Sequence, residues 1–396
     1  MSNKDPGTGG DGGSLLLNQP IVIDNGTSSI KAGFAGSSKP KLVLGTKVGR
    51  PKHMRIMPGG ALEGEQDLGP SSVFVGRKLD EHRGAFVLEY PMDKGVVTES
   101  GWDSMERLWE HVYSKQSLNA KREEHPVLMT EAPLNHRGNR DKIAEVFFES
   151  IRAPALFFSP PSVLSLYASG RTTGVVLDIG EGVAHAVPVY EGFALQHSVS
   201  RSDIAGREVT RHLQLLLRKA GLSFTTTAEA DLVKLMKEEV CYLAPSGHYD
   251  DATEKEAKTQ YQLPDGQAIS LASERYTAPS VLFDPSLLGS EEPGAAELLV
   301  DSIKKSDIDL RPKLFSQIVL AGGCTLTPGF GERLLYEVKA KSPSHTRIRI
   351  SAPPERLYSC YVGGSILASL ATFKDMWVSR ADYEEHGARI LHRNDF

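Results

Sequence analysis

The sequence has few cysteines, no long apolar run and no excess of basic residues. Its 396 residues include only Cys241, Cys324 and Cys360, which are far apart and form no Cys-x-x-Cys pair. This spacing indicates neither a zinc site nor a disulfide framework, and a reducing cytosol suits it best. No stretch approaches the roughly 20 apolar residues of a membrane-spanning helix. The formal net charge of −5 argues against nucleic acid as the main partner.

The start of the chain also lacks the pattern of a targeting segment. Residues 1–13 are rich in Gly and Asp and contain no apolar core, so we expect a flexible, unprocessed arm. The remaining chain is too long for one ordinary core. At about 100–200 residues per domain it should form two or three domains. Its composition, 40% apolar and 24% charged, is typical of globular proteins.

Two segments repeat one design, in which a buried apolar strand runs into an Asp and then a Gly-rich turn. They are Ile21 to Ser29 (IVIDNGTSS) and Val175 to Val183 (VVLDIGEGV). Such a turn can aim several backbone N–H groups at a phosphate, while the Asp faces the accompanying metal ion. Either segment alone is more often an ordinary turn. Two of them facing each other would clamp one nucleoside triphosphate.

The rest of the chain alternates helix and strand patterns in the α/β manner. Apolar residues at helical spacing predict helices over 104–113, 140–151, 206–220, 228–243 and 331–339. Short apolar runs predict strands over 127–131, 155–158 and 316–321. The Gly- and Pro-containing segment 51–70 predicts an exposed loop or small lobe, and a polar region extends to residue 270. The second half repeats the plan of the first, which favours an internal duplication.

A third glycine turn, Gly322–Gly323, follows the strand expected at 316–321. By itself such a pair is common and usually touches no ligand. Three glycine turns that each follow an apolar strand strengthen the case for a shared phosphate site.

Longer runs of the sequence resemble the actin family from about residue 20 to 396. They are Asp24 to Gly26, Lys31 to Gly36 (KAGFAG), Val48 to His53 (VGRPKH), Leu128 to Asn135 (LMTEAPLN), Leu164 to Gly174 (LSLYASGRTTG) and Gly363 to Leu370 (GGSILASL). Within the family the chain is similar to the centractin type, which builds the short filament of dynactin. That similarity rests on Arg55 to Met57, Ala61 to Gly64, Ala144 to Glu149, Ser202 to Arg207 and His392 to Phe396.

The resemblance implies the α/β fold of the actin, Hsp70 and hexokinase-type ATPases, with two duplicated lobes around a cleft for ATP or ADP and Mg. The first large subdomain would comprise residues 14–45, 91–168 and 359–396, and a small outlying subdomain with an inserted loop residues 46–90. The second large subdomain would comprise 169–204 and 291–358, and the second small one 205–290.

The resemblance also implies the residues of the nucleotide site. The first phosphate loop would be Asn25, Gly26, Thr27 and Ser28 with Lys31, and the second Gly180, Glu181, Gly182 and Val183. Asp24 and Asp178 would hold a hydrated Mg²⁺ through water, which suits an ion that sheds water reluctantly. Lys237 and Glu238 would line the nucleoside pocket opposite Gly322 and Gly323, and the catalytic residues would be His185, near the attacking water, and Asp178. From pattern alone, Lys237–Glu238 also fits a solvated helix face, and His185 a structural histidine.

Several positions depart from the family pattern. Pro161 stands where actins carry the glutamine that positions the attacking water. Ile179, Glu181 and Ser28 replace a serine, an aspartate and a glycine of the two loops, and Lys94, Leu357 and Thr327 replace a histidine, a lysine and an aromatic residue. Backbone phosphate donors should survive these changes. Because phosphoryl transfer depends on positioning and electrostatics, we expect nucleotide binding with slow or absent hydrolysis.

Three surface segments are candidates for filament contacts. They are the lengthened loop 57–78, the apolar plug Phe283 to Gly289, and a cleft lined by Tyr167, Ala168, Ser169, Gly170, Leu367 and Met376. Each also fits an ordinary loop or exposed apolar side chains.

The resemblance as a whole predicts a filament-forming subunit of dynactin in the cytoplasm and cytoskeleton. Its partners would be further copies of itself, dynactin subunits, capping proteins, dynein and its adaptors, in microtubule-based transport, with neither nucleic acid nor direct membrane insertion. The alternatives are a conventional-actin-like cytoskeletal ATPase and a nuclear actin-related subunit of a chromatin remodeller. A sugar-kinase-type enzyme shares the fold, but the sequence presents neither its catalytic carboxylate nor its substrate-domain insertion.

Overall fold

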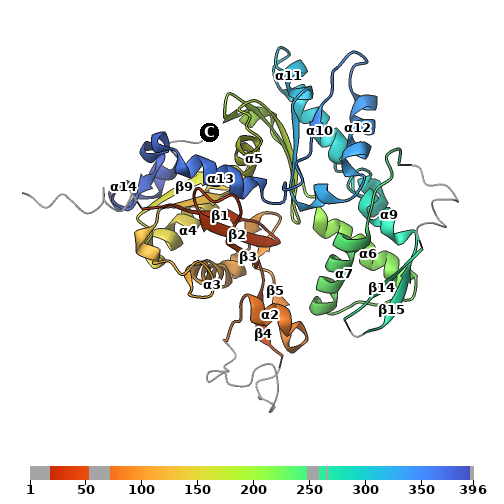
Figure 1. The fold of residues 1–396 in the computed structure, drawn as a ribbon, viewed down its shortest axis with the longest axis horizontal. Helices are drawn as coiled ribbons and strands as arrows, with labels where there is room; N and C mark the ends of the chain where they lie inside the picture. Colours follow the sequence, from red (N-terminus) through yellow and green to blue (C-terminus); the bar gives the residue numbers. More distant parts are fainter. Residues whose placement is uncertain (1–17, 53–71, 248–257, 265, 393–396) are drawn as a thin grey trace, which may run out of the picture.

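A computed structural model describes residues 18–52, 72–247, 258–264 and 266–392. It contains two large sheets with helices packed around them (Figure 1). The first sheet has the strand order β18-β9-β8-β1-β2-β3. Its strands are β1 (Ile21–Asn25), β2 (Ser29–Phe34), β3 (Leu42–Gly45), β8 (Val127–Thr130), β9 (Ala155–Ser159) and β18 (Val378–Ser379). The predicted strands at 127–131 and 155–158 are therefore confirmed.

The second sheet has the order β12-β11-β10-β16-β17, with β13 also paired to β11. Its strands are β10 (Gly174–Ile179), β11 (Ala184–Tyr190), β12 (Phe193–Ala194), β13 (Ser200–Ser202), β16 (Ile318–Ala321) and β17 (Ile350–Ser351).

Both sheets repeat one construction. In the first, the antiparallel pair β1–β2 continues through β8 and β9, which run parallel to β1. In the second, the antiparallel pair β10–β11 continues through β16 and β17, which run parallel to β10. The turns that follow Asp24 and Asp178, called the Asp-Gly turns below, each connect the two strands of one of these equivalent hairpins. The predicted internal duplication is thus present in the topology, and the two turns are its corresponding points.

Helices cover both sheets. The first lobe contains α3 (Trp102–Tyr113), α4 (Arg137–Glu145), α5 (Pro161–Ala168), α13 (Ser359–Ser369) and α14 (Arg380–His386). The second contains α10 (Ala295–Lys305), α11 (Arg311–Phe315) and α12 (Phe330–Lys341). Helix α13 packs against β1 of the first sheet and α5 against β10 of the second, the two helices pack closely on each other, and a Cβ on Gly363 would overlap the carbonyl group of Leu164. This glycine therefore permits the close approach that joins the lobes.

Two smaller units flank the cleft on the lower side of Figure 1. One contains β4 (Val48–Pro51), α2 (Arg77–Glu81) and β5 (Phe86–Glu89), and short strands β6 (Met92–Asp93) and β7 (Val96–Val97) follow it. The other contains α6 (Gly206–Lys219), α7 (Thr227–Val240), β14 (Thr259–Gln262), β15 (Ala268–Leu271) and α9 (Glu274–Ser280). Helix α7 contacts the first unit, since the Thr227 hydroxyl lies 3.4 Å from the Leu88 amide nitrogen.

Each half has its own apolar core. The first is centred on Trp109, Phe147 and Ile23, all fully buried, and the second on Leu177, Leu299 and Phe330. Each fully buried large side chain contributes about 1.5–3 kcal/mol relative to exposure, so the two cores stabilise separate lobes. Among the described residues no helix is long and apolar enough to cross a bilayer.

Local differences from the predicted elements have physical causes. The helix expected over 140–151 is α4 followed by one π-helical turn, Val146–Ser150, which turns Phe147 and Phe148 into the core. The helix expected to reach residue 243 ends at Val240, after which Cys241 is extended. The polar region before residue 270 contains the hairpin β14–β15. Exposed and buried residues alternate along β15, so one face of this small sheet is exposed and the other is covered. The arm 1–13 and most of the segment 51–70 lie outside the described residues.

Candidate functional site

A cavity of about 340 Å³ lies between the two lobes, where the Asp-Gly turns meet. All the residues expected at the nucleotide site line it. They are Asp24, Asn25, Gly26, Thr27, Ser28, Lys31, Asp178, Gly180, Glu181, Gly182, Val183, His185, Lys237, Glu238, Gly322 and Gly323. Pro161, Thr327 and Leu357, three of the positions that depart from the family pattern, line it too. Its volume is that of a small-molecule site.

The first turn, between β1 and β2, is held by its neighbours. The Asn25 amide donates to Thr130 Oγ1 (2.8 Å), and Trp109 Nε1 donates to Asn25 Oδ1 (3.2 Å). The Thr46 hydroxyl donates to the Gly26 carbonyl at 2.6 Å. These contacts fix the turn and engage the Asn25 amide, whereas the Thr27 and Ser28 amides that follow stay available.

The second turn, between β10 and β11, is docked on the start of α6. The Gly206 amide donates to the Gly180 carbonyl (3.0 Å), and the Arg207 amide to the Glu181 carbonyl (2.8 Å). The Gly180 amide closes the turn on the Val183 carbonyl at 3.1 Å. Helix α6 thereby fixes this turn as Thr130 and Trp109 fix the first.

The two turns touch each other and expose backbone donors. A Cβ on Gly182 would lie 2.8 Å from the Thr27 side chain. Within the described chain, the amides of Thr27, Ser28, Glu181, Gly182 and Val183 donate to no protein acceptor. Clustered unpaired N–H groups in turns form an anion-binding concavity. This arrangement fits the phosphate groups of a nucleotide.

The carboxylates of Asp24 and Asp178 lie beside these donors. Lys31 Nζ is 2.9 Å from Asp24 Oδ2, and Thr130 Oγ1 donates to Asp24 Oδ1 at 3.3 Å. Burial and the nearby Asp24 charge raise the pKa of Asp178 to about 7. Burial lowers the pKa of Lys31, but the Asp24 charge outweighs it and the pKa is raised. Two buried carboxylates facing one lysine leave a negative charge that a hydrated Mg²⁺ would neutralise.

His185 faces Asp178 across the β10–β11 ladder. Its Nε2 is 3.6 Å from Asp178 Oδ2, and the side chain is buried. Burial, with a smaller effect of the Arg201 charge, lowers the pKa of His185 to about 3, so the ring is neutral. Neither ring nitrogen has a hydrogen-bond partner within the described residues. A neutral imidazole with free nitrogens can hold a water molecule in the cavity.

Pro161 is the first residue of α5, where its missing N–H costs the helix nothing. Its ring lines the cavity and offers neither a donor nor an acceptor. The cavity thus contains the histidine but has no amide side chain at residue 161.

Lys237 belongs to the cavity wall rather than to a solvated helix face. Its Nζ contacts Glu181 Oε2 (3.0 Å) and the Gly206 carbonyl (2.9 Å), and the side chain is 8% exposed. Burial raises the pKa of Glu181, but the Lys237 charge and hydrogen bond outweigh this and the pKa is lowered. Gly322, with a φ of 84°, leaves room for the Asp178 carboxylate. The third glycine turn therefore belongs to the same site.

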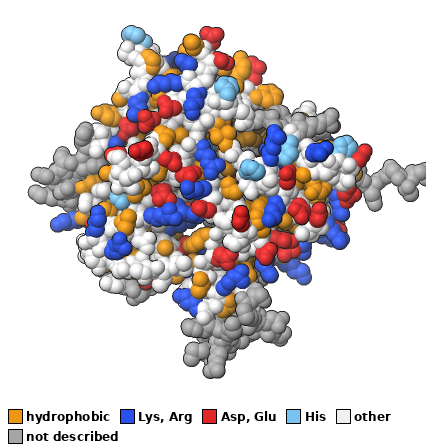
Figure 2. Space-filling model, turned by 180° about the vertical axis from the view of Figure 1, so that it is seen from behind, with side chains coloured by type: hydrophobic (Ala, Val, Ile, Leu, Met, Phe, Trp, Pro, Cys, Tyr) orange, Lys and Arg blue, Asp and Glu red, His pale blue; other side chains and the backbone are white. Residues whose placement is uncertain are grey.

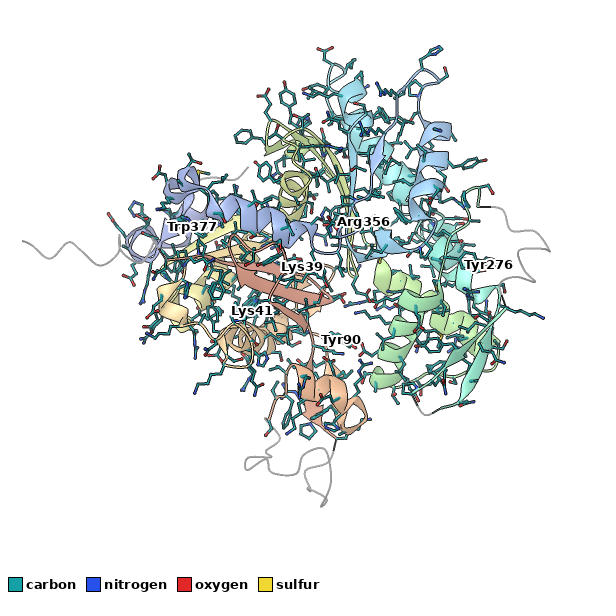
Figure 3. The ribbon with its side chains drawn as sticks, in the orientation of Figure 1. Lys39, Lys41, Tyr90, Tyr276, Arg356 and Trp377 are labelled. Carbon is teal, nitrogen blue, oxygen red and sulfur yellow. The ribbon has the colours of Figure 1, made fainter. Side chains whose placement is uncertain are left out.

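Sequence reasoning missed a set of contacts that join the two smaller units across the cleft. Lys47 Nζ lies 2.7 Å from Asp231 Oδ2 on α7 and 3.0 Å from Asp80 Oδ1. Arg83 and the Tyr90 hydroxyl also approach Asp231, at 3.5 and 3.4 Å. Figure 3 labels Tyr90 at this junction between the two smaller units. We call Lys47, Arg83, Tyr90 and Asp231 the cleft clasp; no local pattern predicts it, because its partners are far apart in the sequence.

Further contacts cross the cleft near the phosphate turns. Lys234 Nζ donates to Ser28 Oγ at 2.5 Å, and Lys94 Nζ pairs with Asp203 at 2.6 Å. Arg207 pairs with Asp93. Two of the positions that depart from the family pattern, Ser28 and Lys94, thus contact the opposite lobe.

All three cysteines line the cavity, a grouping that their spacing along the chain does not predict. They are free thiols, as the absence of a paired spacing predicted. Burial raises the pKa of Cys241 and of Cys324 to about 12, so these thiols stay protonated.

The three segments predicted to form filament contacts differ in the exposure of their side chains. In the plug, Phe283 is buried and Leu287 is 47% exposed at the tip of a 3-10 turn, Pro285–Leu288. In the expected cleft, Tyr167 and Leu367 are half-buried. Most of the loop 57–78 lies outside the described residues, and its last two residues begin α2.

Comparisons with known proteins agree with this geometry. The family model described as Actin matches residues 16–396. The chain belongs to the actin family. It is 51% identical over 378 residues to an "Actin-like protein" of Neurospora crassa, covering 94% of this chain and 97% of that protein. The fold is accordingly the mixed α/β architecture of the actin, Hsp70 and hexokinase-type ATPases, and members of the actin family typically bind ATP or ADP with a divalent metal ion.

The contact between the two turns predicts a position-specific effect of glycine substitution. Gly182→Ala places a methyl group 2.8 Å from Thr27 and forces the turns apart. Overpacking of this kind costs about 1–3 kcal/mol, so we expect nucleotide affinity to fall at least about fivefold. Equilibrium binding of a fluorescent ATP analogue measures this.

The matched control is Gly180→Ala in the same turn. A Cβ there meets only the Val183 carbonyl, at 3.6 Å, an ordinary contact. Affinity should change less than about threefold. Equal losses in the two variants would show that the turns are not held in contact.

Proposed function

We propose that this protein is an actin-like filament subunit that holds ATP or ADP with Mg²⁺ as an internal brace and hydrolyses it slowly or not at all. One observation carries the proposal. The cavity has both phosphate turns and both carboxylates, whereas Pro161 gives it no side chain that could orient water.

Different residues of the cavity would bind the phosphates, the metal ion and the nucleoside. The free amides of the two turns and the Lys31 ammonium group would hold phosphate oxygens, and Asp24 and Asp178 would hold the hydrated ion through water. When bound, Mg²⁺ would neutralise charge on the phosphates. Lys237 and Glu238 would contact the nucleoside opposite Gly322 and Gly323.

Hydrolysis would be slow because, of the two side chains expected to position the attacking water, His185 is present and the glutamine is replaced by Pro161. His185 can accept from or donate to a water through its free nitrogens. Pro161 cannot provide a second contact, so His185 alone would leave the orientation of the water unrestrained. Since positioning supplies most of the catalysis in phosphoryl transfer, this loss affects the rate far more than the affinity.

The nucleotide would act as a brace because the cavity walls come from both lobes. A ligand that binds only the closed, folded state adds about 4 kcal/mol of stability when its concentration is 1,000 times the Kd. The cleft clasp joins the two smaller units on either side of the cleft, and Lys234 links α7 to Ser28. Retained nucleotide would therefore stabilise the subunit without being consumed.

For the assembly, we propose the short filament of dynactin in the cytoplasm and cytoskeleton. The similarity of residues 144–149 and 202–207 to the centractin type supports this assignment. Further copies, dynactin subunits, capping proteins, dynein and its adaptors would be the partners, in microtubule-based transport. We also propose the four-subdomain division set out above, with the plug and loop 57–78 as filament contacts.

Electron microscopy of the native assembly tests this part of the proposal. Short filaments of uniform length together with dynactin subunits are expected. Long homopolymers would instead favour a conventional-actin-like ATPase, a second candidate supported by the retained His185. Monomers within a chromatin complex would contradict both.

A further inference from the structure

A second cavity lies in the second large lobe, away from the nucleotide site. Its volume is about 490 Å³, and its lining is Arg171, Pro312, Lys313, Ser316, Gln317, Arg347 and Arg349. Four of these side chains are positively charged and none is negatively charged. Helix α11, which supplies part of the wall, lies at the top of Figure 1, at the opposite end from α2 and β4. We call this cavity the basic pocket.

The local sequence explains why two arginines point into it. Arg347 and Arg349 alternate with Ile348 and Ile350 on the approach to β17, and both isoleucines pack against the core of the second lobe. Side chains of an extended segment alternate between its faces. The guanidinium groups are therefore turned away from the core.

The backbone of the pocket is fixed from several sides. The Arg349 amide donates to the Phe315 carbonyl, and the Arg349 carbonyl accepts from the Ile318 amide, both at 3.1 Å. The Gln317 carbonyl accepts from the Val175 amide at 3.0 Å. Residues from α11, β16 and the segment before β17 thus have fixed relative positions, which lowers the cost of ordering them around a ligand.

Within the part of the chain that the structure describes, these positive charges have no acidic partners. No ion pair within the described residues involves Arg171, Lys313, Arg347 or Arg349. Lys313 Nζ instead lies 5.4 Å from the centre of the Tyr190 ring. On the face shown in Figure 2, basic and acidic side chains are interspersed. A concave cluster of four cations is unusual for a chain of net charge −5, and it concentrates a field that attracts anions.

We propose that the basic pocket binds a compact polyphosphate anion, either a free inositol polyphosphate or the same phosphate groups on a lipid headgroup. Three guanidinium groups offer planar forks that match phosphate oxygens in pairs. Ser316 and Gln317 add neutral donors, and the concave shape suits a small ligand better than an extended acidic peptide.

The test uses the full-length protein saturated with Mg–ADP, so that the nucleotide cavity is occupied. Inositol hexakisphosphate is titrated by calorimetry at physiological salt, and vesicles with 5% phosphatidylinositol 4,5-bisphosphate are used for co-sedimentation. The double variant R347Q/R349Q should weaken binding of the recognised probe at least tenfold. Both residues are exposed, and thermal melting verifies that the variant folds.

The matched control is R218Q/K219Q at the exposed end of α6, which removes the same charge elsewhere. It should leave binding within twofold of the wild-type value. Binding to the soluble probe indicates a free ligand, and binding to vesicles alone indicates a headgroup; both support the proposal. Equal losses in both variants, no binding of either probe, or binding of a poly-glutamate peptide alone would overturn it.

Discussion

Replacing Pro161 by glutamine is expected to raise the rate of ATP hydrolysis by about 10–100-fold. The new amide would extend from the first turn of α5 into the cavity that contains His185 and Asp178. It could then hold the water that the neutral His185 ring contacts on one side only. Misplacing a reactant by about 1 Å costs on the order of 100-fold, which sets this range. Phosphate release from the purified protein, measured under single-turnover conditions, gives the rate.

Pro161→Ala is the matched control for this variant. It removes the proline ring but adds no hydrogen-bonding group, so its rate should stay within about twofold of the wild type. A double variant P161Q/H185A should lose the gain, because both contacts to the water are required. If P161A accelerates hydrolysis as much as P161Q, the cause is the loss of the proline ring from the first turn of α5, and the role assigned to the amide is wrong.

Asp231→Ala is expected to open the cleft and destabilise the protein. The substitution leaves Lys47 and Arg83 without their shared carboxylate at a site where Asp231 is only 7% exposed. Removing one partner of a buried ion pair costs about 3 kcal/mol or more. Nucleotide should dissociate at least about tenfold faster, because the clasp no longer opposes opening. Displacement of a fluorescent ATP analogue and chemical denaturation measure the two effects.

Asp80→Asn is the control that distinguishes the loss of the Asp231 contact from a general loss of negative charge around Lys47. Asp80 contacts the same ammonium group at 3.0 Å, but its side chain is 45% exposed and lies on the same side of the cleft. The cost should be below about 1 kcal/mol, with an unchanged dissociation rate. Equal acceleration by the two variants would contradict the assignment of Asp231 as the closing contact.

The sequence was sufficient for features that depend on neighbouring residues. Each Asp-Gly turn follows an apolar strand, so β1–β2 and β10–β11 could be predicted, and the repeated pattern predicted the duplication. The helix α7 was predicted as well, but from its pattern the exposure of Lys237 could not be decided. The family resemblance implied that this side chain lines the nucleoside pocket, and in the structure it lies on the cavity wall.

The remaining features depend on contacts between distant segments. The cleft clasp joins residues separated by 184 positions, and neither Lys47 nor Asp231 stands in a distinctive local pattern. The three cysteines come from three different elements, yet all line one cavity. The hairpin β14–β15 is short and half-exposed, so its alternation is weak in a polar region. Packing between lobes creates the cleft clasp and brings the cysteines together, and local propensity does not encode it.

The substitution at Glu181 illustrates how a departure from the family pattern changes the site. Its carboxylate reaches Lys237 Nζ at 3.0 Å and lies over Gly206, where a Cβ would approach it to 2.6 Å. The backbone amide of Glu181 remains free for phosphate. The side chain thus stabilises the wall between α6 and α7, while the turn keeps its binding function. A structural role for the side chain and a binding role for the backbone fit a site that retains its nucleotide rather than hydrolysing it.

The nucleotide content of newly assembled filaments tests the central claim most directly. The protein is loaded with radiolabelled ATP, assembled, and quenched at intervals, and the ratio of ATP to ADP in the sedimented filaments is determined beside conventional actin. The account predicts that bound ATP disappears at least tenfold more slowly than in conventional actin. Conversion to ADP with phosphate release at the rate of conventional actin would contradict it.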